Sequence, residues 1–292
     1  MNLPCTTEDL KPQKGKMDLK SLLIKADLND GQGEAIISED NIFLTDKNVL
    51  PNCVLIEYVN QLVAAIQGYR EKYQNMKPLR GLFVGVQEVD FINEVYSGDR
   101  IFIRGSVIQD IANIKFIKGI IEKENTKIAE IVTKIFEIEN IEEFDRLIEK
   151  NQPISEKEIN FNVKSPPEYL DSNIKRKFYS YIKNITVDKD SISLSFSCPS
   201  DFDPFDGHFY DNPILPGIML IEIVDIALRL FYERATTIKS IKKMKIGGVI
   251  TPYKKVNLNL KVNSVDSLCS FFAEFYEENG DEISRFNGTA LI

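Results

Sequence analysis

The chain has 292 residues, of which 43% are hydrophobic and 27% are charged, and its formal net charge is −8. This length allows one large domain or two of about 100–150 residues each. The acidic balance argues against broad nucleic-acid binding, which needs a basic face. A single histidine and four scattered cysteines without a C-x-x-C pair argue against a zinc site of the usual kind.

The N-terminal segment, residues 1–17, is polar and rich in lysine, so it lacks the apolar core of a secretory signal. No run of about 18 residues is apolar and free of charge, which predicts that no transmembrane helix is present. The four cysteines are interpreted as free thiols of a reducing compartment. We therefore expect a cytoplasmic protein.

An internal repeat divides the chain into two halves. Pro51 lies six residues before Glu57, and Pro216 lies six residues before Glu222. An apolar run follows each proline, and a proline is well suited to the first position of a helix. A helix that is apolar on every side is buried. The sequence therefore predicts one buried central helix in each half, with a glutamate in its second turn.

Strand-like runs follow each predicted helix. They cover residues 82–89, 100–107, 115–122 and 128–138 in the first half, and residues 238–246, 254–262, 267–276 and 285–292 in the second. Shorter runs precede the helices at residues 33–37 and 191–198. Gly98-Asp99 and Asn279-Gly280 supply turns. Each half is thus predicted to be a long helix with an antiparallel meander, an α+β architecture.

The predicted domain limits follow from this repeat. Residues 1–150 form the first unit, residues 151–169 form a linker and residues 170–292 form the second unit. The first unit ends in a charged stretch, residues 141–150, that is expected to be helical, and the linker contains Pro153, Pro166 and Pro167.

The most informative string covers residues 205–222: Phe-Asp-Gly-His-Phe-Tyr-Asp-Asn-Pro-Ile-Leu-Pro-Gly-Ile-Met-Leu-Ile-Glu. It resembles the G-H-F-x-x-x-P-x-x-P-G motif, with a carboxylate fourteen residues after the histidine, of the hotdog-fold 3-hydroxyacyl-acyl-carrier-protein dehydratases. A fainter resemblance extends over both halves, from about Leu10 and about Phe178. It implies a double hotdog, in which two antiparallel sheets each wrap a long central helix and the paired hotdogs share their active sites.

In that family each site takes its histidine from one hotdog and its carboxylate from the other. The first half keeps Glu57 and Gln61, but Phe43 stands where its histidine is expected. In the second half Ile226 replaces the glutamine that follows the carboxylate. The resemblance therefore implies one complete site, His208 with Glu57, and one pairing, Glu222 with Phe43, that lacks its base.

The expected chemistry is the loss of water from a 3-hydroxyacyl thioester, which needs a base at C2 and an acid at the C3 hydroxyl. A neutral imidazole accepts a proton near neutral pH, and a carboxyl in an apolar pocket favours its protonated form. The amide of Gly217, near a helix start, is suited to bind the thioester oxygen. The resemblance implies that the Ile214 carbonyl orients His208, and Gln61 lies one helical turn from Glu57. The reaction requires neither a cofactor nor a metal.

Several plainer interpretations stay open. His208 could be a structural loop residue, and Glu57 could be an exposed helix residue. Glu222 is either a relic or a buried acid paired across the interface, while Asp225 and Arg229 have the spacing of a helical ion pair. Other function classes are a hotdog thioesterase and an acyl-binding or scaffold protein without catalysis. The histidine motif favours the dehydratase.

A basic segment suggests a partner. It contains Arg229, Arg234, Lys239, Lys242, Lys243 and Lys245 but only one acid, Glu233. It is either a solvated face or a docking surface for an acidic acyl-carrier protein with its phosphopantetheine-linked substrate. Because two fused hotdogs can bury each other's faces, a monomer is sufficient, and a higher homo-oligomer is the alternative.

Overall fold

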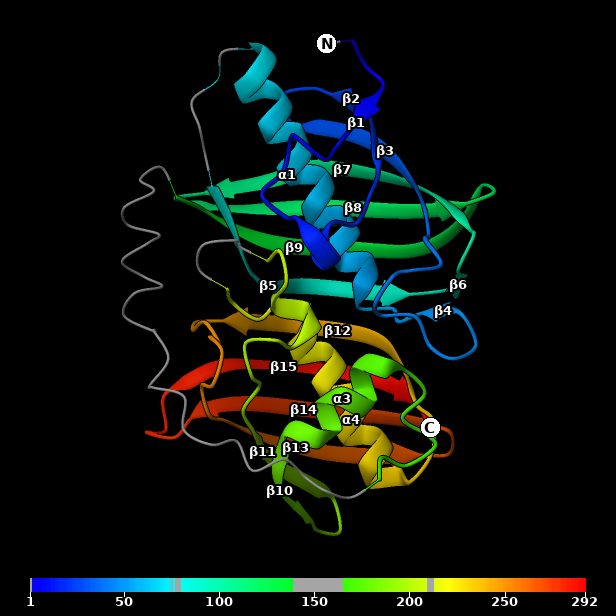
Figure 1. Ribbon diagram of the computed structural model, residues 1–292, viewed down its shortest axis with the longest axis vertical. Helices are drawn as coiled ribbons and strands as arrows, with labels where there is room; N and C mark the ends of the chain where they lie inside the picture. The colour runs from blue at the N-terminus through cyan, green and yellow to red at the C-terminus, as the bar shows by residue number, and fades with distance from the viewer. Residues whose placement is uncertain (1, 75, 77–79, 139–164, 209–212) are drawn as a thin grey trace.

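The computed structural model describes residues 2–74, 76, 80–138, 165–208 and 213–292. Figure 1 shows two halves stacked along the long axis, each with a helix lying against a curved part of the sheet. In the first half the elements are β1 (Cys5–Thr6), η1 (Gly15–Met17), β2 (Leu22–Ala26), β3 (Asp30–Ile36), β4 (Val49–Leu50), α1 (Val54–Gln74), β5 (Arg80–Phe91), β6 (Val95–Tyr96), β7 (Arg100–Ile111), β8 (Ile114–Lys123) and β9 (Thr126–Ile138).

The second half repeats this plan with fewer strands. Its elements are α3 (Asn173–Tyr181), β10 (Ile182–Val187), β11 (Ser191–Phe196), η2 (Asp203–Phe205), α4 (Ile218–Tyr232), β12 (Thr237–Ile246), β13 (Val256–Val265), β14 (Leu268–Glu277) and β15 (Glu282–Leu291). The predicted strands are present, several with longer or shifted ends, and Gly280 has the positive φ of the expected turn between β14 and β15.

The two central helices, α1 and α4, are present and largely buried, as their apolar runs predict. They begin later than expected, however, at Val54 and Ile218 rather than at the prolines. The carbonyls of Pro51 and Pro216 accept hydrogen bonds from the amides of Val54 and Met219, three residues on. Each proline therefore belongs to a tight turn that leads into its helix, because its fixed φ suits the turn as well as a first helical position.

The sheet differs from the expected pair of separate sheets. Thirteen of the described strands form one antiparallel sheet in the order β1-β2-β3-β7-β8-β9-β5-β12-β15-β14-β13-β11-β10. The halves join where β5 pairs with β12, with Val89 opposite Ile241 and Glu88 opposite Lys242. Since an edge strand exposes unpaired N–H and C=O groups, pairing the two edges satisfies both. Figure 1 shows these strands side by side at the middle of the molecule.

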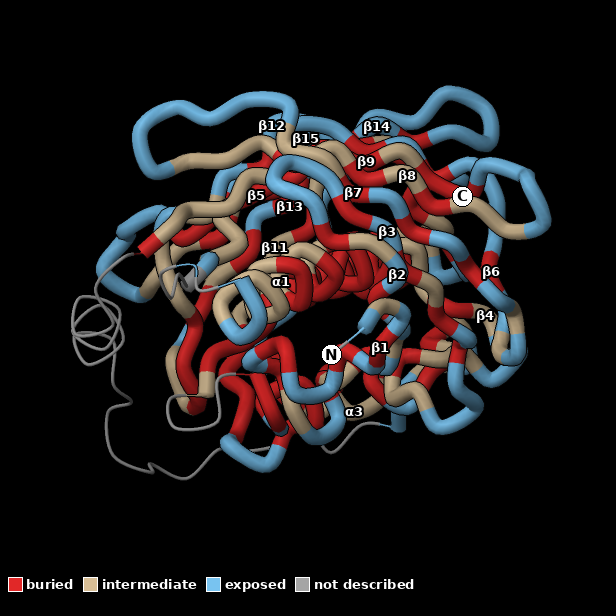
Figure 2. The backbone as a smooth tube through the Cα atoms, turned by 90° about the horizontal axis from the view of Figure 1, so that it is seen from above, coloured by how far each residue is buried: buried red, intermediate tan, exposed pale blue. Residues whose placement is uncertain are grey.

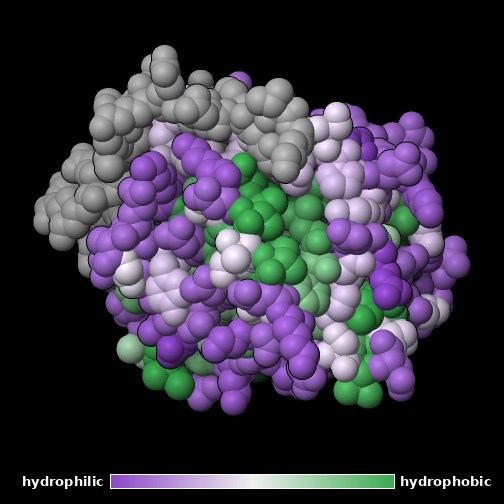
Figure 3. Space-filling model, turned by 90° about the horizontal axis from the view of Figure 1, so that it is seen from below, coloured by the Kyte–Doolittle hydropathy of each residue, from purple (hydrophilic) through white to green (hydrophobic). Residues whose placement is uncertain are grey.

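The core is shared by both halves. One contiguous cluster of buried apolar side chains includes residues of α1, α4 and the inner sheet face. Figure 2 shows the buried part of α1 in the interior, beneath the strands. On the face seen in Figure 3, hydrophilic side chains cover most of the surface around a central apolar region. No helix in the described ranges is long and apolar enough to cross a membrane.

Some predicted features cannot be compared with the structure. The predicted helical stretch 141–150 and most of the linker lie outside the described residues, so the domain limits 1–150, 151–169 and 170–292 stay predictions. Helix α3, just after the predicted linker, was not expected. Its Ser172 side chain caps the helix by accepting a hydrogen bond from the Lys175 amide, which is a local signal that could have identified it.

Candidate active site

His208 lies in the turn that follows η2, where its amide donates to the Phe205 carbonyl. The imidazole is buried, and its Nδ1 lies 2.8 Å from the Ile214 carbonyl oxygen. A carbonyl can only accept, so the neutral ring carries its proton on Nδ1 and presents Nε2 as the basic nitrogen. Burial lowers the pKa of His208 to about 4, and the bond to Ile214 opposes the shift only in part. The ring is therefore neutral at physiological pH.

The glycine before His208 has a steric role. Gly207 has a φ of +84°, and a Cβ there would lie 1.7 Å from the Lys14 carbonyl oxygen. The Lys14 amide donates to the Gly207 carbonyl at 2.9 Å. Only glycine combines this backbone angle with such close approach, so Gly207 lets the N-terminal segment pack against the histidine turn. Residues 209–212 of the motif lie outside the described residues.

Glu57 lies in the first turn of α1 and is buried. Burial raises the pKa of its carboxyl to about 7, although the Gln61 amide and the charge of Lys11 act in the opposite direction. Gln61 Nε2 donates to Glu57 Oε1 at 2.9 Å and to the Met17 carbonyl at 2.7 Å. Gln61 thus holds the carboxyl in place, and the carboxyl keeps a proton near neutral pH.

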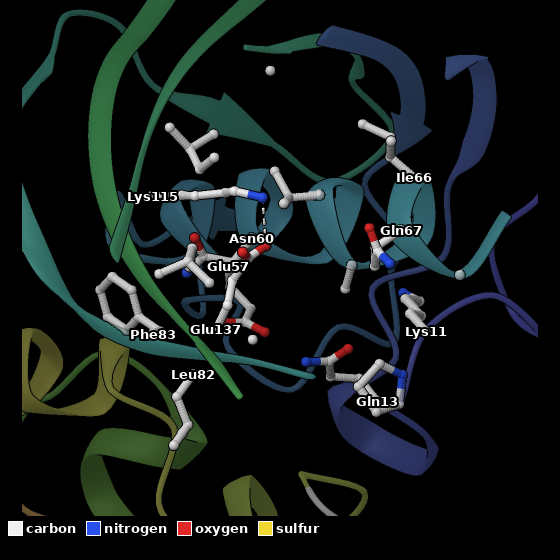
Figure 4. A pocket seen from close by; sticks show the side chains of 18 of the residues that line it. Lys11, Gln13, Glu57, Asn60, Ile66, Gln67, Leu82, Phe83, Lys115 and Glu137 are labelled. Atoms are coloured by element: carbon white, nitrogen blue, oxygen red, sulfur yellow. Dashed lines mark ion pairs between the residues drawn. The ribbon is translucent and has the colours of Figure 1, made fainter. Parts of the chain in front are cut away.

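The structure brings these residues to one cavity of about 580 Å³. Figure 4 shows a close view of the cavity with Glu57 and Lys11 labelled. His208, Glu57, Ile214 and Gly217 all line it. Gly217 is the N-cap of α4, and a Cβ there would lie 2.6 Å from Phe83 Cδ1. The cavity is therefore built by both halves, with the histidine from the second and the carboxyl from the first.

Lys11 is a cavity residue that sequence reasoning missed. Its side chain is buried, its Nζ lies 2.6 Å from Asp18 Oδ1, and it donates to the Leu19 carbonyl at 2.8 Å and to Gln61 Oε1. Burial lowers the pKa of Lys11, and Asp18 opposes that shift. No local pattern distinguishes Lys11 from the other lysines of the polar N-terminal segment. Its role depends on how that segment folds over α1.

Glu222 has a different environment from Glu57 and is not among the residues that line this cavity. Lys175 Nζ, from α3, lies 2.9 Å from Glu222 Oε1 and 3.2 Å from Asp225 Oδ2. Arg229 Nε donates to Asp225 Oδ2 at 2.8 Å, which confirms the predicted helical pair. The Cys53 thiol, whose pKa is raised by burial, lies 3.5 Å from Glu222 Oε2. Glu222 is thus a buried acid that pairs with Lys175 of its own half, while Cys53 contacts it from the first half of the chain.

The basic segment is smaller at the surface than its sequence suggests. Arg229 is buried and also contacts Asp171 at 3.0 Å, so it does not belong to an exposed patch. Lys242, Lys243 and Lys245 are exposed on β12. The strand leads from them to Ile246, which lines the cavity. The exposed lysines are therefore close in sequence to Ile246, a cavity residue, and they lie on β12, the strand that joins the two halves.

Two family models match separate parts of the chain. Residues 5–146 match the ApeP-like model, described as ApeP dehydratase, and residues 184–285 match the ApeI-like model, described as ApeI dehydratase. No curated protein matches the sequence significantly.

Three solved structures illustrate the structural likeness. The dehydratase domain of PpsC from Mycobacterium tuberculosis, in complex with C12:1-CoA, aligns with a TM-score of 0.54 and 10% identity, over 92% of this chain and 96% of its own. The 12:0-ACP thioesterase from Umbellularia californica aligns with a TM-score of 0.55 and 8% identity, over 89% and 93%. A chain of the dehydratase heterocomplex ApeI:P from Xenorhabdus doucetiae aligns with a TM-score of 0.45 and 19% identity, over 51% and 99%.

The first two alignments show the fold, and they include one dehydratase and one thioesterase. The two family matches are both to dehydratases, so they favour the dehydratase class. The chain belongs to the hotdog-fold dehydratases, as a fused double hotdog with an ApeP-like first half and an ApeI-like second half.

Proposed function

We propose that the chain dehydrates a 3-hydroxyacyl thioester to the 2-enoyl thioester at a single composite site, in fatty-acid or polyketide-like lipid synthesis. One observation carries this proposal. His208 and Glu57, from different halves, line one cavity, with the imidazole held neutral and the carboxyl held near its protonated form. A neutral base together with a neutral acid is the pair that this elimination needs.

The proposed reaction begins when Nε2 of His208 takes the C2 proton. The electron pair of the broken C2–H bond forms the C2=C3 double bond, and the C3–O bond breaks. Glu57 gives its proton to the departing hydroxyl, which leaves as water. The amide of Gly217, at the start of α4, stabilises the negative charge that develops on the thioester oxygen. Proton exchange with solvent then restores both groups.

Turnover of a 3-hydroxyacyl thioester to the enoyl product tests this assignment. The variants to compare are His208→Ala, Glu57→Gln and Glu222→Gln. We expect the first two to lose at least about a hundredfold in kcat, the usual contribution of general acid–base catalysis, while the third keeps activity per folded molecule. Circular dichroism separates loss of chemistry from loss of fold. Equal losses in all three variants would contradict a single composite site.

The proposed substrate carrier is an acyl-carrier protein with its phosphopantetheine arm. The support is electrostatic: Lys242, Lys243 and Lys245 are exposed on the strand that leads to the cavity of an otherwise acidic chain. Changing all three to Glu should raise KM for a carrier-bound substrate but not for a short pantetheine thioester. The matched control changes the exposed Lys183, Lys189 and Lys261 to Glu, with the same change in net charge. Equal effects of both triple variants would argue against specific docking.

The thioesterase alternative rests on the likeness to the Umbellularia californica enzyme. Thiol release distinguishes the two reactions, since dehydration leaves the thioester intact and hydrolysis frees the thiol. If the chain binds acyl thioesters but yields neither an enoyl product nor a free thiol, the acyl-binding or scaffold function replaces both.

A further inference from the structure

One stripe of α1 that lines the cavity is mostly polar, although Val63 and Ile66 of the same helix, which also line the cavity, are apolar. Glu57, Asn60, Ala64, Gln67 and Glu71 are spaced three or four residues apart, so they form one stripe along the helix, and all five line the cavity. Only Ala64 among them is apolar. Figure 4 shows the labelled Glu57, Asn60 and Gln67 along the same side of α1. A tunnel for a saturated acyl chain would be expected to present apolar side chains here.

The facing wall is mostly apolar. Phe83 of β5, Val107 of β7, Ile117 of β8 and Ile135 of β9 line the same cavity. The two charged side chains from these strands that line the cavity, Lys115 and Glu137, pair with each other at 2.8 Å. The cavity is therefore amphipathic, with hydrogen-bonding groups along the helix and hydrocarbon along the sheet.

Asn60 is the next polar member of the stripe after Glu57. Its Oδ1 and Nδ2 are both shielded from solvent, and neither has a hydrogen-bond partner among the residues that the structure describes. Gln67, in contrast, donates to Glu71 Oε1 at 3.1 Å. A sheltered amide without partners is costly and needs an explanation. Because Asn60 faces the cavity one helical turn beyond Glu57, a ligand in the cavity is suited to supply the missing partner.

We propose that the acyl chain of the substrate carries an oxygen, as a hydroxyl or a carbonyl, that binds the Asn60 amide. Either oxygen fits, since an amide both donates and accepts. Residues three apart on a helix have Cβ atoms about 5–6 Å apart, which spans roughly four bonds of about 1.5 Å in an extended chain. When the C3 hydroxyl of the substrate lies at Glu57, the oxygen that binds Asn60 is therefore carried near C7 of the acyl chain. This inference rests on the proposed dehydratase function and names its substrate class.

The test compares two pantetheine thioesters of equal length, 3-hydroxydecanoyl and 3,7-dihydroxydecanoyl, with the full chain. The wild type should have a kcat/KM roughly tenfold higher for the dihydroxy substrate, which is the effect of one net hydrogen bond. Asn60→Leu, which is close to isosteric, should reverse this preference, mainly through KM. Asn184→Leu makes the same chemical change at an exposed position in β10 and should keep the wild-type ratio.

Each outcome decides a separate point. If the wild type dehydrates both substrates at the same kcat/KM, or prefers the plain chain, the amide binds no substrate oxygen and the inference is wrong. If it dehydrates neither, the proposed function fails first. Should Asn60→Leu not fold, a series of 3,5-, 3,7- and 3,9-dihydroxy substrates on the wild type takes its place. The inference requires a maximum near C7, and a flat profile would overturn it.

Discussion

At the scale of single residues, burial acts in opposite directions on the two candidate catalytic groups. It disfavours the charged form of each, so it raises the pKa of Glu57 to about 7 and lowers the pKa of His208 to about 4. Between these values the carboxyl is protonated and the imidazole is neutral. An ordinary solvent-exposed pair would have the reverse charge states over much of this range, because a carboxyl normally titrates below an imidazole.

The pH dependence of kcat/KM should follow from these shifts. The proposed reaction requires neutral His208, which is lost as the pH falls through about 4, and protonated Glu57, which is lost as the pH rises through about 7. We therefore expect a plateau between these values and a decline above neutral pH, measured as initial rates with a fixed thioester. A profile that rises from pH 6 to pH 8.5 would contradict these roles.

Lys11 should affect the pH at which kcat/KM declines on the alkaline side of this profile, here called the upper limb. Its positive charge lowers the pKa of Glu57, and its Nζ donates to Gln61, which in turn holds the Glu57 carboxyl. Lys11→Met should therefore shift the upper limb to higher pH and reduce kcat by loosening Glu57. In the single variant the Asp18 carboxylate is left without its cation. The double variant Lys11→Met/Asp18→Asn removes that carboxylate, so it should show the same pH shift with a smaller loss of stability than Lys11→Met alone. An unchanged upper limb in both variants would exclude this positioning role.

At the scale of elements, α3 supplies a buried cation to α4. The ammonium of Lys175 lies among the carboxylates of Glu222, Asp225 and Asp171, at 2.9, 3.2 and 3.7 Å. Burial opposes this charge, but the carboxylates more than offset that effect, so the pKa of Lys175 is raised. The counterpart of Glu57 in the second half has thus become part of an ion cluster that packs two helices together.

Removing the cation should destabilise the fold without removing the chemistry. Lys175→Met leaves the buried carboxylate of Glu222 without its cation and should lower the free energy of unfolding by about 3–5 kcal/mol, measured by urea denaturation. Activity per folded molecule should persist, since Glu222 does not line the cavity.

The control for this prediction lies on the same helix. Lys177 pairs with Asp203, but its side chain is 41% exposed, and Lys16 also contacts Asp203. Lys177→Met should therefore cost no more than about 1 kcal/mol. Equal costs of the two variants would mean that the buried cluster does not stabilise the packing of α3 on α4.

At the scale of the whole molecule, one sheet and one core join the two halves that build the cavity. The two strands that meet at the junction are each irregular on their other side: β12 breaks register with β15 between Lys242 and Lys245, and β5 breaks register with β9 between Phe83 and Gly85. Gly85 has a φ of +142°, and a Cβ there would lie 2.1 Å from the Met244 carbonyl oxygen. The strands therefore approach closely only because residue 85 has no side chain.

Gly85→Ala should weaken this junction and, with it, the alignment of His208 and Glu57. We expect a loss of about 2–4 kcal/mol in the free energy of unfolding, from backbone strain and the clash with Met244 together. The activity of the folded fraction should also fall.

Gly98→Ala is the matched control for this change. Gly98 also has a positive φ, +85°, but nothing lies within 4 Å of the position of its Cβ. This variant should show the backbone strain alone, about 1 kcal/mol, with activity retained. Equal effects on activity in both variants would show that the close contact at the junction does not position the site.

Short-range patterns in the sequence account for much of the fold. The apolar runs after Pro51 and Pro216 predicted α1 and α4, and alternation with turn residues predicted the long strands. The short strands β1, β2, β4, β6 and β10 and the helix α3 were not predicted. Strands β4 and β6, for example, pair with each other from positions far apart in the chain, so neither has a pattern of its own. The same reason explains why the edge pairing of β5 with β12 was not foreseen.

The sequence by itself determined the repeat, the histidine motif around His208 and the substitution of that histidine by Phe43 in the first half, since these are properties of residue order. Only the tertiary structure decided that His208 and Glu57 line one cavity, that Lys11 supports Gln61, and that Lys175 neutralises Glu222. Those contacts join residues far apart in the chain, and burial, which sets their charge states, exists only once the chain has folded.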